Sequence, residues 1–175
     1  TQQGTDVFTQ NYPTEVAAMN QYTTTYQSNN GTIYAMWSSY FNALNNVNAA
    51  IDRSKSVILK TDDPDGIEPS ALAQLVAEAK ALRAWYLFEI VRNWGQGPLK
   101  INESKGPSYT VEYSNGAAFY QQIFTDLEEA ISVLPWRQMG SNYGRMSKAA
   151  AKHIRALAYL TRGYEEYADP KDFEN

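Results

Sequence analysis

The chain has 175 residues, of which 43% are apolar, and it carries a formal net charge of −4 and no cysteine. This length suits one domain or one piece of a larger protein, and the apolar share is enough for a packed core. The acidic balance argues against nucleic-acid binding, which needs a basic face. The missing cysteine excludes disulfides, thiol nucleophiles and cysteine-ligated metals.

The chain shows no targeting or membrane-spanning segment. No run of about 18 apolar residues is present, and the polar residues 1–10 do not resemble a signal peptide. Because Thr1 is not a natural start, we expect sequence to be missing on both sides of this chain. The 4 Trp, 13 Tyr and 6 Phe exceed the needs of a minimal core, so some of these rings are expected on a surface or in a binding groove.

The N-terminal third is predicted to hold a short helix and then a long one. The short helix covers about residues 14–22 and is followed by a polar loop. The long helix covers about 33–59, with Asn30 or Thr32 as its N-cap. Its apolar stripe recurs at three- and four-residue steps, through Ile33, Trp37, Tyr40, Leu44, Val47 and Ile51.

The next helix, about 71–94, is predicted to form the inside of the molecule. From Ala84 to Val91 it is apolar on nearly every side, and Glu89 is the only charge in that run. A helix of this kind is buried between other helices. Ser70 is its expected N-cap, and Gly95 can take the left-handed conformation that ends a helix.

Two more helices are predicted after long loops. Residues 96–116 form the longest non-helical segment, roughly twenty residues where a median connection has about 4–6. Loops of that length usually have a task. A helix follows over about 117–134, and after a second loop another helix covers about 148–167, with Ser147 as its cap.

A short motif occurs twice. Residues 79–84 read AKALRA and residues 151–156 read AKHIRA, so the motif returns 72 positions later. One motif in the second helix of each of two helical hairpins is typical of a helical-repeat solenoid, and 72 is about twice the 34-residue tetratricopeptide period. We therefore predict an all-α, tetratricopeptide-like scaffold of two long helical hairpins, a short N-terminal helix and long irregular loops. The helices that carry the two copies are expected to be equivalent inner helices.

Four blocks of sequence carry a family resemblance. The longest consists of residues 77–86, 91–95 and 97–99 of the apolar helix. The other three, in chain order, are Trp37–Tyr40 with Asn48, then Tyr120–Ile123 with Asp126–Ala130 and Leu134–Pro135, then Gly144–Ala150. In this order the blocks resemble the SusD/RagB proteins, which are nutrient-binding outer-membrane lipoproteins of Bacteroidota.

The resemblance implies a tetratricopeptide-like scaffold that supports a more irregular, ligand-binding remainder. It also implies non-catalytic capture of glycan at the outer surface of the bacterial outer membrane. The implied partner is a SusC-type, TonB-dependent transporter that receives the oligosaccharide, and the implied attachment is a lipid anchor. The cysteine that would carry the lipid and the long C-terminal portion of the family are absent from this chain. The resemblance thus covers part of a typical member, and fold transfers better than ligand.

Sugar binding needs a flat ring for the apolar face of a pyranose and polar groups for its hydroxyls. Three loops offer both, and the one over residues 22–34 is favoured because its rings and amides stand together just before a long helix. Its predicted carbohydrate-binding residues are Tyr22, Tyr26, Asn29 and Asn30. The other two loops offer Asn102, Tyr109 and Tyr113, and Arg137, Asn142 and Tyr143. The alternative for all three loops is surface packing or contact with the missing part of the protein.

The remaining recognisable residues are assigned to packing rather than to ligand: Trp37, Tyr40, Arg83, Trp85, Tyr86, Trp94, Asp126, Gly144 and Arg145. Gly144 is expected to supply a backbone conformation that other residues avoid. An ion pair is expected between Arg83, Arg145 or Arg155 and Glu78, Glu89 or Asp126, and the sequence leaves open which pair forms.

No catalytic residue, metal ligand or cofactor is predicted. His153 is the only histidine, it lies between charged helix neighbours and is expected to be solvated, and one histidine without cysteine makes no conventional zinc site. A structural calcium ion at the acidic turn 62–66 is a secondary hypothesis. The main alternative function is a helical-repeat module that binds protein without sugar, and a glycan-processing enzyme is the remotest one.

Overall fold

The structure is a computed structural model of the chain, and it describes Gln27 and residues 30–174. The chain divides into two compact units, residues 1–41 and 42–175. The helix predicted at 14–22 lies outside the described residues. That the whole chain forms one helical domain stays a prediction. Within the described part, no helix combines the length and the apolar character needed to cross a bilayer.

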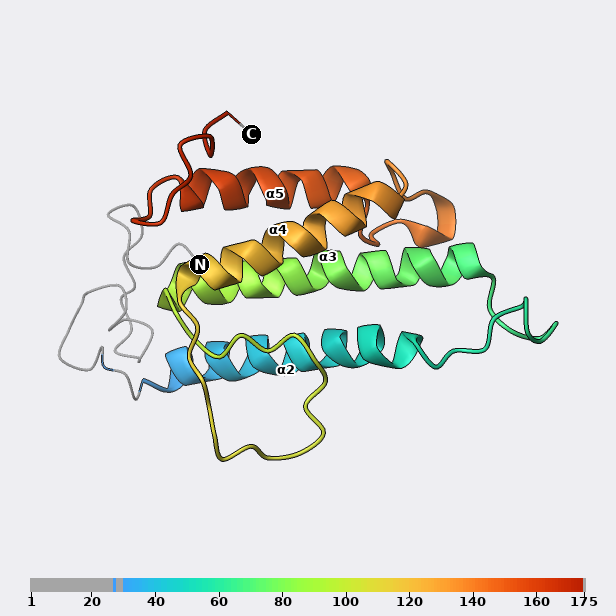
Figure 1. Ribbon diagram of the computed structural model, residues 1–175, viewed down its shortest axis with the longest axis horizontal. Coiled ribbons are helices and arrows are strands. Elements are labelled where there is room, and N and C mark those ends of the chain that lie inside the picture. The colour runs from blue at the N-terminus through green and yellow to red at the C-terminus, as the bar shows by residue number, and fades with distance from the viewer. Residues whose placement is uncertain (1–26, 28–29, 175) are drawn as a thin grey trace, which may run out of the picture. The chain divides into compact units, whose positions relative to one another are not determined.

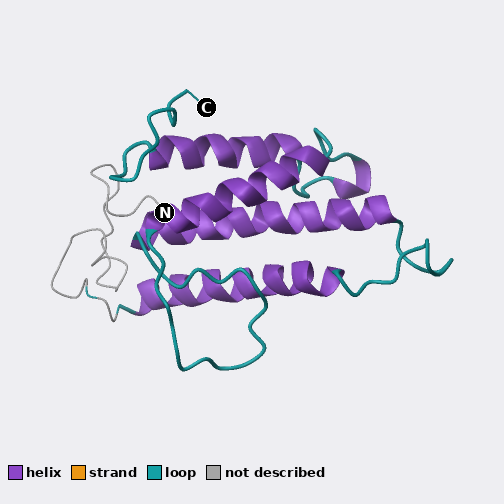
Figure 2. Ribbon diagram, in the orientation of Figure 1, coloured by secondary structure: helices purple, strands orange, loops and turns teal. Residues whose placement is uncertain are grey.

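The described part is all-helical, as predicted (Figures 1 and 2). Its elements are α2 (Gly31–Ser54), α3 (Pro69–Trp94), α4 (Gly116–Val133), the short 3-10 helix η1 (Gly140–Asn142) and α5 (Lys148–Arg162). In the second unit, α4 packs between α3 and α5 and runs antiparallel to both (Figure 1). The helices are joined by long connections, so the scaffold presents loops at both of its ends.

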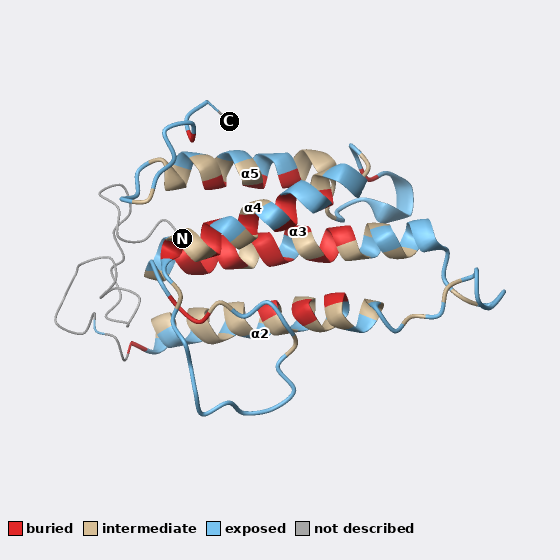
Figure 3. Ribbon diagram, in the orientation of Figure 1, coloured by how far each residue is buried: buried red, intermediate tan, exposed pale blue. Residues whose placement is uncertain are grey.

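The core of the second unit lies between α3 and α4. The helix α3 is buried along most of its length, as its all-round apolar sequence predicts (Figure 3). Its fully buried side chains meet aromatic and aliphatic side chains of α4. The largest of these core side chains are Leu87, Phe88, Ile90, Phe119, Tyr120, Ile123 and Leu127. Burying one large apolar side chain contributes about 1.5–3 kcal/mol, so the packing of these side chains stabilises the contact between α3 and α4.

Polar side chains and glycines define most of the helix ends. The Oδ1 atom of Asn30 accepts hydrogen bonds from the backbone N–H groups of Thr32 and Ile33, at 3.0 and 3.3 Å, so Asn30 rather than Thr32 is the N-cap of α2. Ser147 caps α5 as predicted, since its Oγ accepts from the N–H of Ala150. At the other end of α3, Gly95 has a φ of 72°, which confirms the expected left-handed stop.

The helix α2 ends at Ser54, five residues before the predicted end at Leu59. The Ser54 hydroxyl donates to the carbonyl of Ile51 at 2.7 Å, and such side-chain bonds compete with helix continuation. Beyond it, Leu59 forms an isolated β-bridge with Ile67, which closes the acidic turn. The backbone of residues 58–60 is therefore engaged in that bridge and cannot continue the helix.

The helix α3 begins at Pro69, so the prediction that Ser70 caps it was wrong. Pro69 occupies the first turn, where its missing N–H costs nothing. Glu68 stands at the N-cap position without a side-chain cap bond.

The helix α5 ends at Arg162 rather than at the predicted Tyr167. The ring of Phe173 packs over Gly163, where an added Cβ would lie 2.6 Å from the ring. The chain turns there, and the residues that follow fold back. The ring of Tyr167 packs against Gly116, at the start of α4.

The two copies of the repeated motif are not equivalent, which corrects the prediction. In α3, Arg83 and Ala84 are buried, whereas in α5 the matching Arg155 is half-buried and Ala156 is exposed. The physical reason is position: α3 is enclosed on most sides, but α5 buries only a single stripe that faces α4.

A glycine substitution in the acidic turn tests this description. An alanine Cβ at Gly66 would lie 2.5 Å from the backbone carbonyl carbon of Leu59, and the Leu59–Ile67 bridge would have to open. We expect Gly66→Ala to lower the free energy of unfolding by about 1–3 kcal/mol, measured by urea denaturation. Gly106→Ala is the matched control, because nothing lies within 4 Å of its Cβ position. Equal midpoints for the two variants would contradict the described turn.

Candidate functional site

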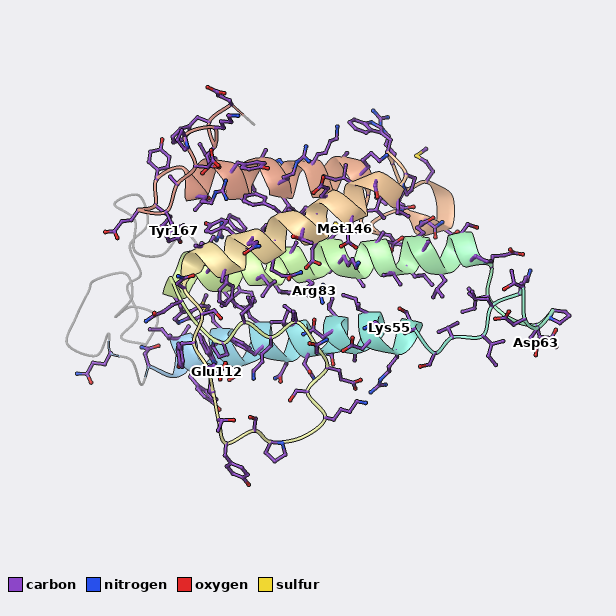
Figure 4. All side chains as sticks on the ribbon, viewed as in Figure 1. Lys55, Asp63, Arg83, Glu112, Met146 and Tyr167 are labelled. Atoms are coloured by element: carbon purple, nitrogen blue, oxygen red, sulfur yellow. The ribbon has the colours of Figure 1, made fainter. Side chains whose placement is uncertain are left out.

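The centre of the second unit is a buried ion pair between α3 and α4. The guanidinium of Arg83 (labelled in Figure 4) donates from Nε and Nη2 to the two carboxylate oxygens of Asp126, at 2.8 and 2.7 Å. The side chains are 8% and 1% exposed. Gln122, one turn before Asp126, donates a further hydrogen bond to the same carboxylate. The pair is thus bidentate and fully desolvated, the geometry in which charge-assisted hydrogen bonds are strongest.

The same arginine reaches α2 and the long loop. Its Nη1 donates to the backbone carbonyl of Ile101 at 2.8 Å and to Oδ1 of Asn48 at 3.3 Å. The buried amide of Asn48 in turn donates to the carbonyls of Lys100 and Asn102. Three successive loop carbonyls therefore find partners from two helices, so residues 100–102 have a fixed path along α2.

A second set of contacts holds residues 103 and 104. The backbone N–H of Glu103 donates to the carboxylate of Asp52 at 2.8 Å, and that of Ser104 donates to the side chain of Asn45 at 2.7 Å. The first bond, with a smaller contribution from Lys55, lowers the pKa of Asp52 to about 2. A side-chain hydrogen bond from Arg53 likewise lowers the pKa of Glu103. Asp52 therefore stays ionised in this contact well into the acid range.

Residues 105–113, which follow these contacts, are exposed, and the loop is closed again at Ser114. Gly97 and Ser114 exchange two backbone hydrogen bonds, which close the loop at its base. Between the contacts, the ring of Tyr109 is 96% exposed and that of Tyr113 is 64% exposed. Two accessible rings thus project from a loop whose ends are fixed.

The loop between α4 and α5 is fixed by a cluster at its inner side. Glu78 of α3 accepts hydrogen bonds from Gln138 at 3.2 Å and from Nε of Arg145 at 2.9 Å. Arg145 also donates to Oδ1 of Asn142 at 3.1 Å. Gly144 has a φ of 91°, which confirms the conformation expected of it.

The outer side of the same loop is open. A pocket of about 340 Å³ is lined by residues 137–139, residues 143–145 and Ser147. The ring of Tyr143, in this lining, is 86% exposed, and the ring of Trp136, which precedes the lining residue Arg137 in sequence, is 55% exposed. The Nζ atom of Lys152, on α5, lies 5.5 Å from the centre of the Trp136 ring.

The predicted carbohydrate-binding residues fall at the edge of what the structure describes. Tyr22, Tyr26 and Asn29 lie outside the described residues. Asn30 is described, and its side-chain oxygen is used as the N-cap of α2. Their role in sugar binding stays a prediction. The aromatic residues of the other two candidate loops, by contrast, are brought to the surface, as sugar stacking requires.

The ion pairs left open by the sequence are resolved. Arg83 pairs with Asp126 and Arg145 with Glu78. Glu89 forms its bridge with a neighbour, Arg92, that the sequence analysis did not consider. His153 is exposed, as expected. In the described ranges, no three His, Asp or Glu side chains are grouped closely enough to hold a metal ion.

Sequence reasoning missed the residues that hold the long loop, chiefly Asn45, Asn48 and Asp52. One signal could have found them: the face of the first long helix opposite its apolar stripe is rich in asparagine. Amides carry both donors and acceptors, so an amide-rich face suits the capture of an irregular backbone.

Comparison with known proteins identifies the family. Residues 2–165 match the SusD-like model described as "Starch-binding associating with outer membrane". The chain belongs to this SusD-like family. A SusD-like protein of Bacteroides ovatus is 28% identical to it over 127 residues, which are 72% of this chain and 22% of the relative.

Solved structures of SusD-like proteins share the fold. A laminarin-binding SusD-like protein superposes with a TM-score of 0.64 at 29% identity, over 74% of this chain and 26% of that one. A crystal structure with xylogluco-oligosaccharide gives a TM-score of 0.66 at 25% identity, over 81% and 27% of the two chains. The likeness confirms the tetratricopeptide-like helical scaffold. The chain spans about a quarter of the length of these relatives.

The buried ion pair yields a stability prediction. Asp126→Asn leaves the guanidinium of Arg83 buried without its charge partner, so we expect a loss of about 3–5 kcal/mol in the free energy of unfolding, measured by urea denaturation. Lys60→Gln is the control, since it removes one partner of the exposed Lys60–Glu68 pair and should cost about 0–1 kcal/mol. Similar losses in both variants would show that burial does not set the strength of the Arg83 pair.

The depressed pKa of Asp52 yields a pH prediction. Its folded value of about 2 lies below the ordinary 3.8, so its stabilising contact is complete above about pH 4 and is lost as the pH falls through 2. We expect the amide proton of Glu103 to titrate in NMR spectra with a midpoint near pH 2. Asp52→Asn should abolish this titration, whereas Asp65→Asn, in the acidic turn, should leave it unchanged. A midpoint near 4 in the parent chain would contradict the contact.

Proposed function

We propose that the chain is part of a non-catalytic glycan-binding protein at the bacterial cell surface. In this proposal it binds oligosaccharide and delivers it to a SusC-type, TonB-dependent transporter in the outer membrane. The observation that carries the proposal is membership of a family described as starch-binding and associated with the outer membrane. Two structural neighbours add support, one named as laminarin-binding and one solved with a xylogluco-oligosaccharide.

The geometry of the described part suits binding rather than catalysis. Its buried carboxylates are engaged in ion pairs: Asp126 with Arg83, Glu78 with Arg145, Glu89 with Arg92, and Asp172 with Arg162. Glycoside hydrolysis needs two facing carboxyl groups, one of them with a raised pKa. The pKa values of Asp52, Glu103 and Asp172 are lowered rather than raised, by the hydrogen bonds that these carboxylates accept.

The exposed rings supply what a carbohydrate ligand needs. Tyr109, Tyr113, Trp136 and Tyr143 stand on loops whose ends are fixed to helices. A fixed base limits the conformational entropy lost when a loop closes on a ligand. Attachment by a lipid anchor and contact with the transporter belong to the proposal and rest on the family resemblance.

A second candidate function is a helical module that binds protein without sugar. One observation favours it: open apolar pockets border the first turns of α3. One, of about 430 Å³, is lined by Leu59, Leu72 and Val76 among others, and a second, of about 330 Å³, by Val57, Ile67 and Leu75 among others. Neither pocket has an aromatic ring in its lining, so neither suits a sugar.

Glycan binding is testable by calorimetry on the protein expressed with all of the sequence that its gene encodes. We expect laminarin or xyloglucan oligosaccharides, or another member of a polysaccharide panel, to bind without being hydrolysed. Failure of every glycan to bind, together with capture of an outer-membrane transporter, would favour the module that binds protein without sugar. Release of reducing ends that is lost on replacing a Glu or Asp would instead support an enzyme.

The predicted site is tested by replacing Tyr26 and Asn29 with alanine. Losing one stacking ring and one hydrogen-bonding amide should weaken binding of the glycan found above about tenfold or more, since each contact contributes on the order of 1 kcal/mol. Tyr164→Ala is the matched control, because it removes an exposed ring that lies outside the three candidate loops. Unchanged affinity in the double variant would remove residues 22–34 from the site.

A further inference from the structure

Charge is distributed very unevenly along this chain. Residues 130–164 contain six of its 15 Lys and Arg residues, its only histidine and no Asp or Glu. The chain as a whole has a net charge of −4, so an acidic protein carries one strongly basic segment of 35 residues. This segment comprises the end of α4, the loop over residues 134–147 and the whole of α5.

Most of the positive charge in this segment is not neutralised within the described part of the chain. Arg145 is bridged to Glu78 and Arg162 to Asp172. The other four cations form no salt bridge to a described carboxylate. They are Arg137, Lys148, Lys152 and Arg155. We call these four residues the cationic face.

Three of the four residues of the cationic face lie on one side of α5, beside an aromatic ring. Lys148, Lys152 and Arg155 are spaced at i, i+4 and i+7, so they share one side of α5. The loop is held against the start of this helix, because the N–H of Lys148 donates to the carbonyl of Pro135 at 2.8 Å. The Trp136 ring therefore stands beside Lys152, at 5.5 Å from its Nζ atom.

The pocket extends this surface on the loop side. Arg137, next to Trp136 in sequence, lines the pocket of about 340 Å³ together with Tyr143 and Arg145. Arg145 is fixed by Glu78, whereas Arg137 is exposed. Exposed rings, a pocket and unneutralised cations thus occur together on the loop over residues 134–147 and the start of α5.

We propose that this surface binds acidic oligosaccharides, with the Trp136 ring stacking on a sugar and the cationic face binding its carboxylate or sulfate groups. The inference rests on the proposed glycan-binding function and names the class of glycan. A neutral sugar can accept hydrogen bonds from these cations, but only an acidic sugar also neutralises their charge. Guanidinium and ammonium groups bind carboxylate and sulfate oxygens through charge-assisted hydrogen bonds. The exposed ring distinguishes a saccharide from a ligand recognised by charge alone.

The test uses matched pairs of probes that differ only in charge. Oligogalacturonides are compared with their methyl-esterified forms, and dextran sulfate with dextran, by calorimetry on the complete protein at two salt concentrations. We expect at least one acidic probe to bind about tenfold or more tightly than its neutral counterpart, with an affinity that falls as salt rises. The two pairs distinguish a carboxylate from a sulfate ligand.

Variants locate the binding. Arg137→Gln combined with Lys152→Gln should weaken binding of the acidic probe about tenfold or more. Lys100→Gln combined with Lys105→Gln, on the long loop, changes the net charge equally and should have no effect. Trp136→Phe should retain much of the affinity that Trp136→Ala loses, since phenylalanine keeps a flat ring. Circular dichroism checks that each variant keeps its helices.

The outcomes distinguish the acidic-glycan inference from the proposed glycan-binding function. Equal binding of acidic and neutral probes, or equal loss in the two double variants, overturns the acidic-glycan inference and leaves glycan binding standing. Equal binding of polyglutamate and oligogalacturonide shows recognition of charge without sugar and also overturns the inference. Failure of every acidic and neutral glycan to bind overturns both proposals.

Discussion

The arrangement of the second unit depends on one guanidinium. Arg83 connects α3 to α4 through Asp126, to α2 through Asn48 and to the long loop through the carbonyl of Ile101. In a buried ion pair the attraction between the charges is largely offset by the loss of hydration, so its net contribution to stability is small. The pair does, however, require one geometry, because any other position of Arg83 relative to Asp126 leaves a buried charge unpaired. The pair therefore acts mainly by selecting one arrangement of these four segments.

This arrangement separates the packed helical core from the loops that carry the exposed aromatic residues. The contact between α3 and α4 is made by apolar side chains that tolerate little change in volume. The aromatic residues suited to ligand stand on loops, which reach the surface from ends held by hydrogen bonds. A binding protein gains from this division, because affinity depends on how much order the free protein already has.

The sequence predicted the four long helices that the structure describes, and the buried character of α3, because periodicity and all-round apolarity are local signals. The predicted C-terminal ends of α2 and α5 were wrong, because tertiary contacts determine them. The end of α2 depends on the bridge from Leu59 to Ile67, and the end of α5 depends on the ring of Phe173 over Gly163. The sequence named the candidate partners of the ion pairs but could not predict which of them pair, since Arg83 and Asp126 are 43 residues apart. The contacts of Asn48 with the loop could not be predicted for the same reason, since they join residues more than 50 positions apart.

The long loop is tied down at residues 100–104 and again at Ser114, so only the stretch between these contacts is unconstrained. The entropy of closing such a segment grows with the logarithm of its length, and doubling that length costs only about 0.6 kcal/mol. Insertions there would leave the buried network untouched. The tip around Tyr109 is thus a place where descendants of this protein can acquire new ligand contacts by insertion, without rebuilding the helices beneath.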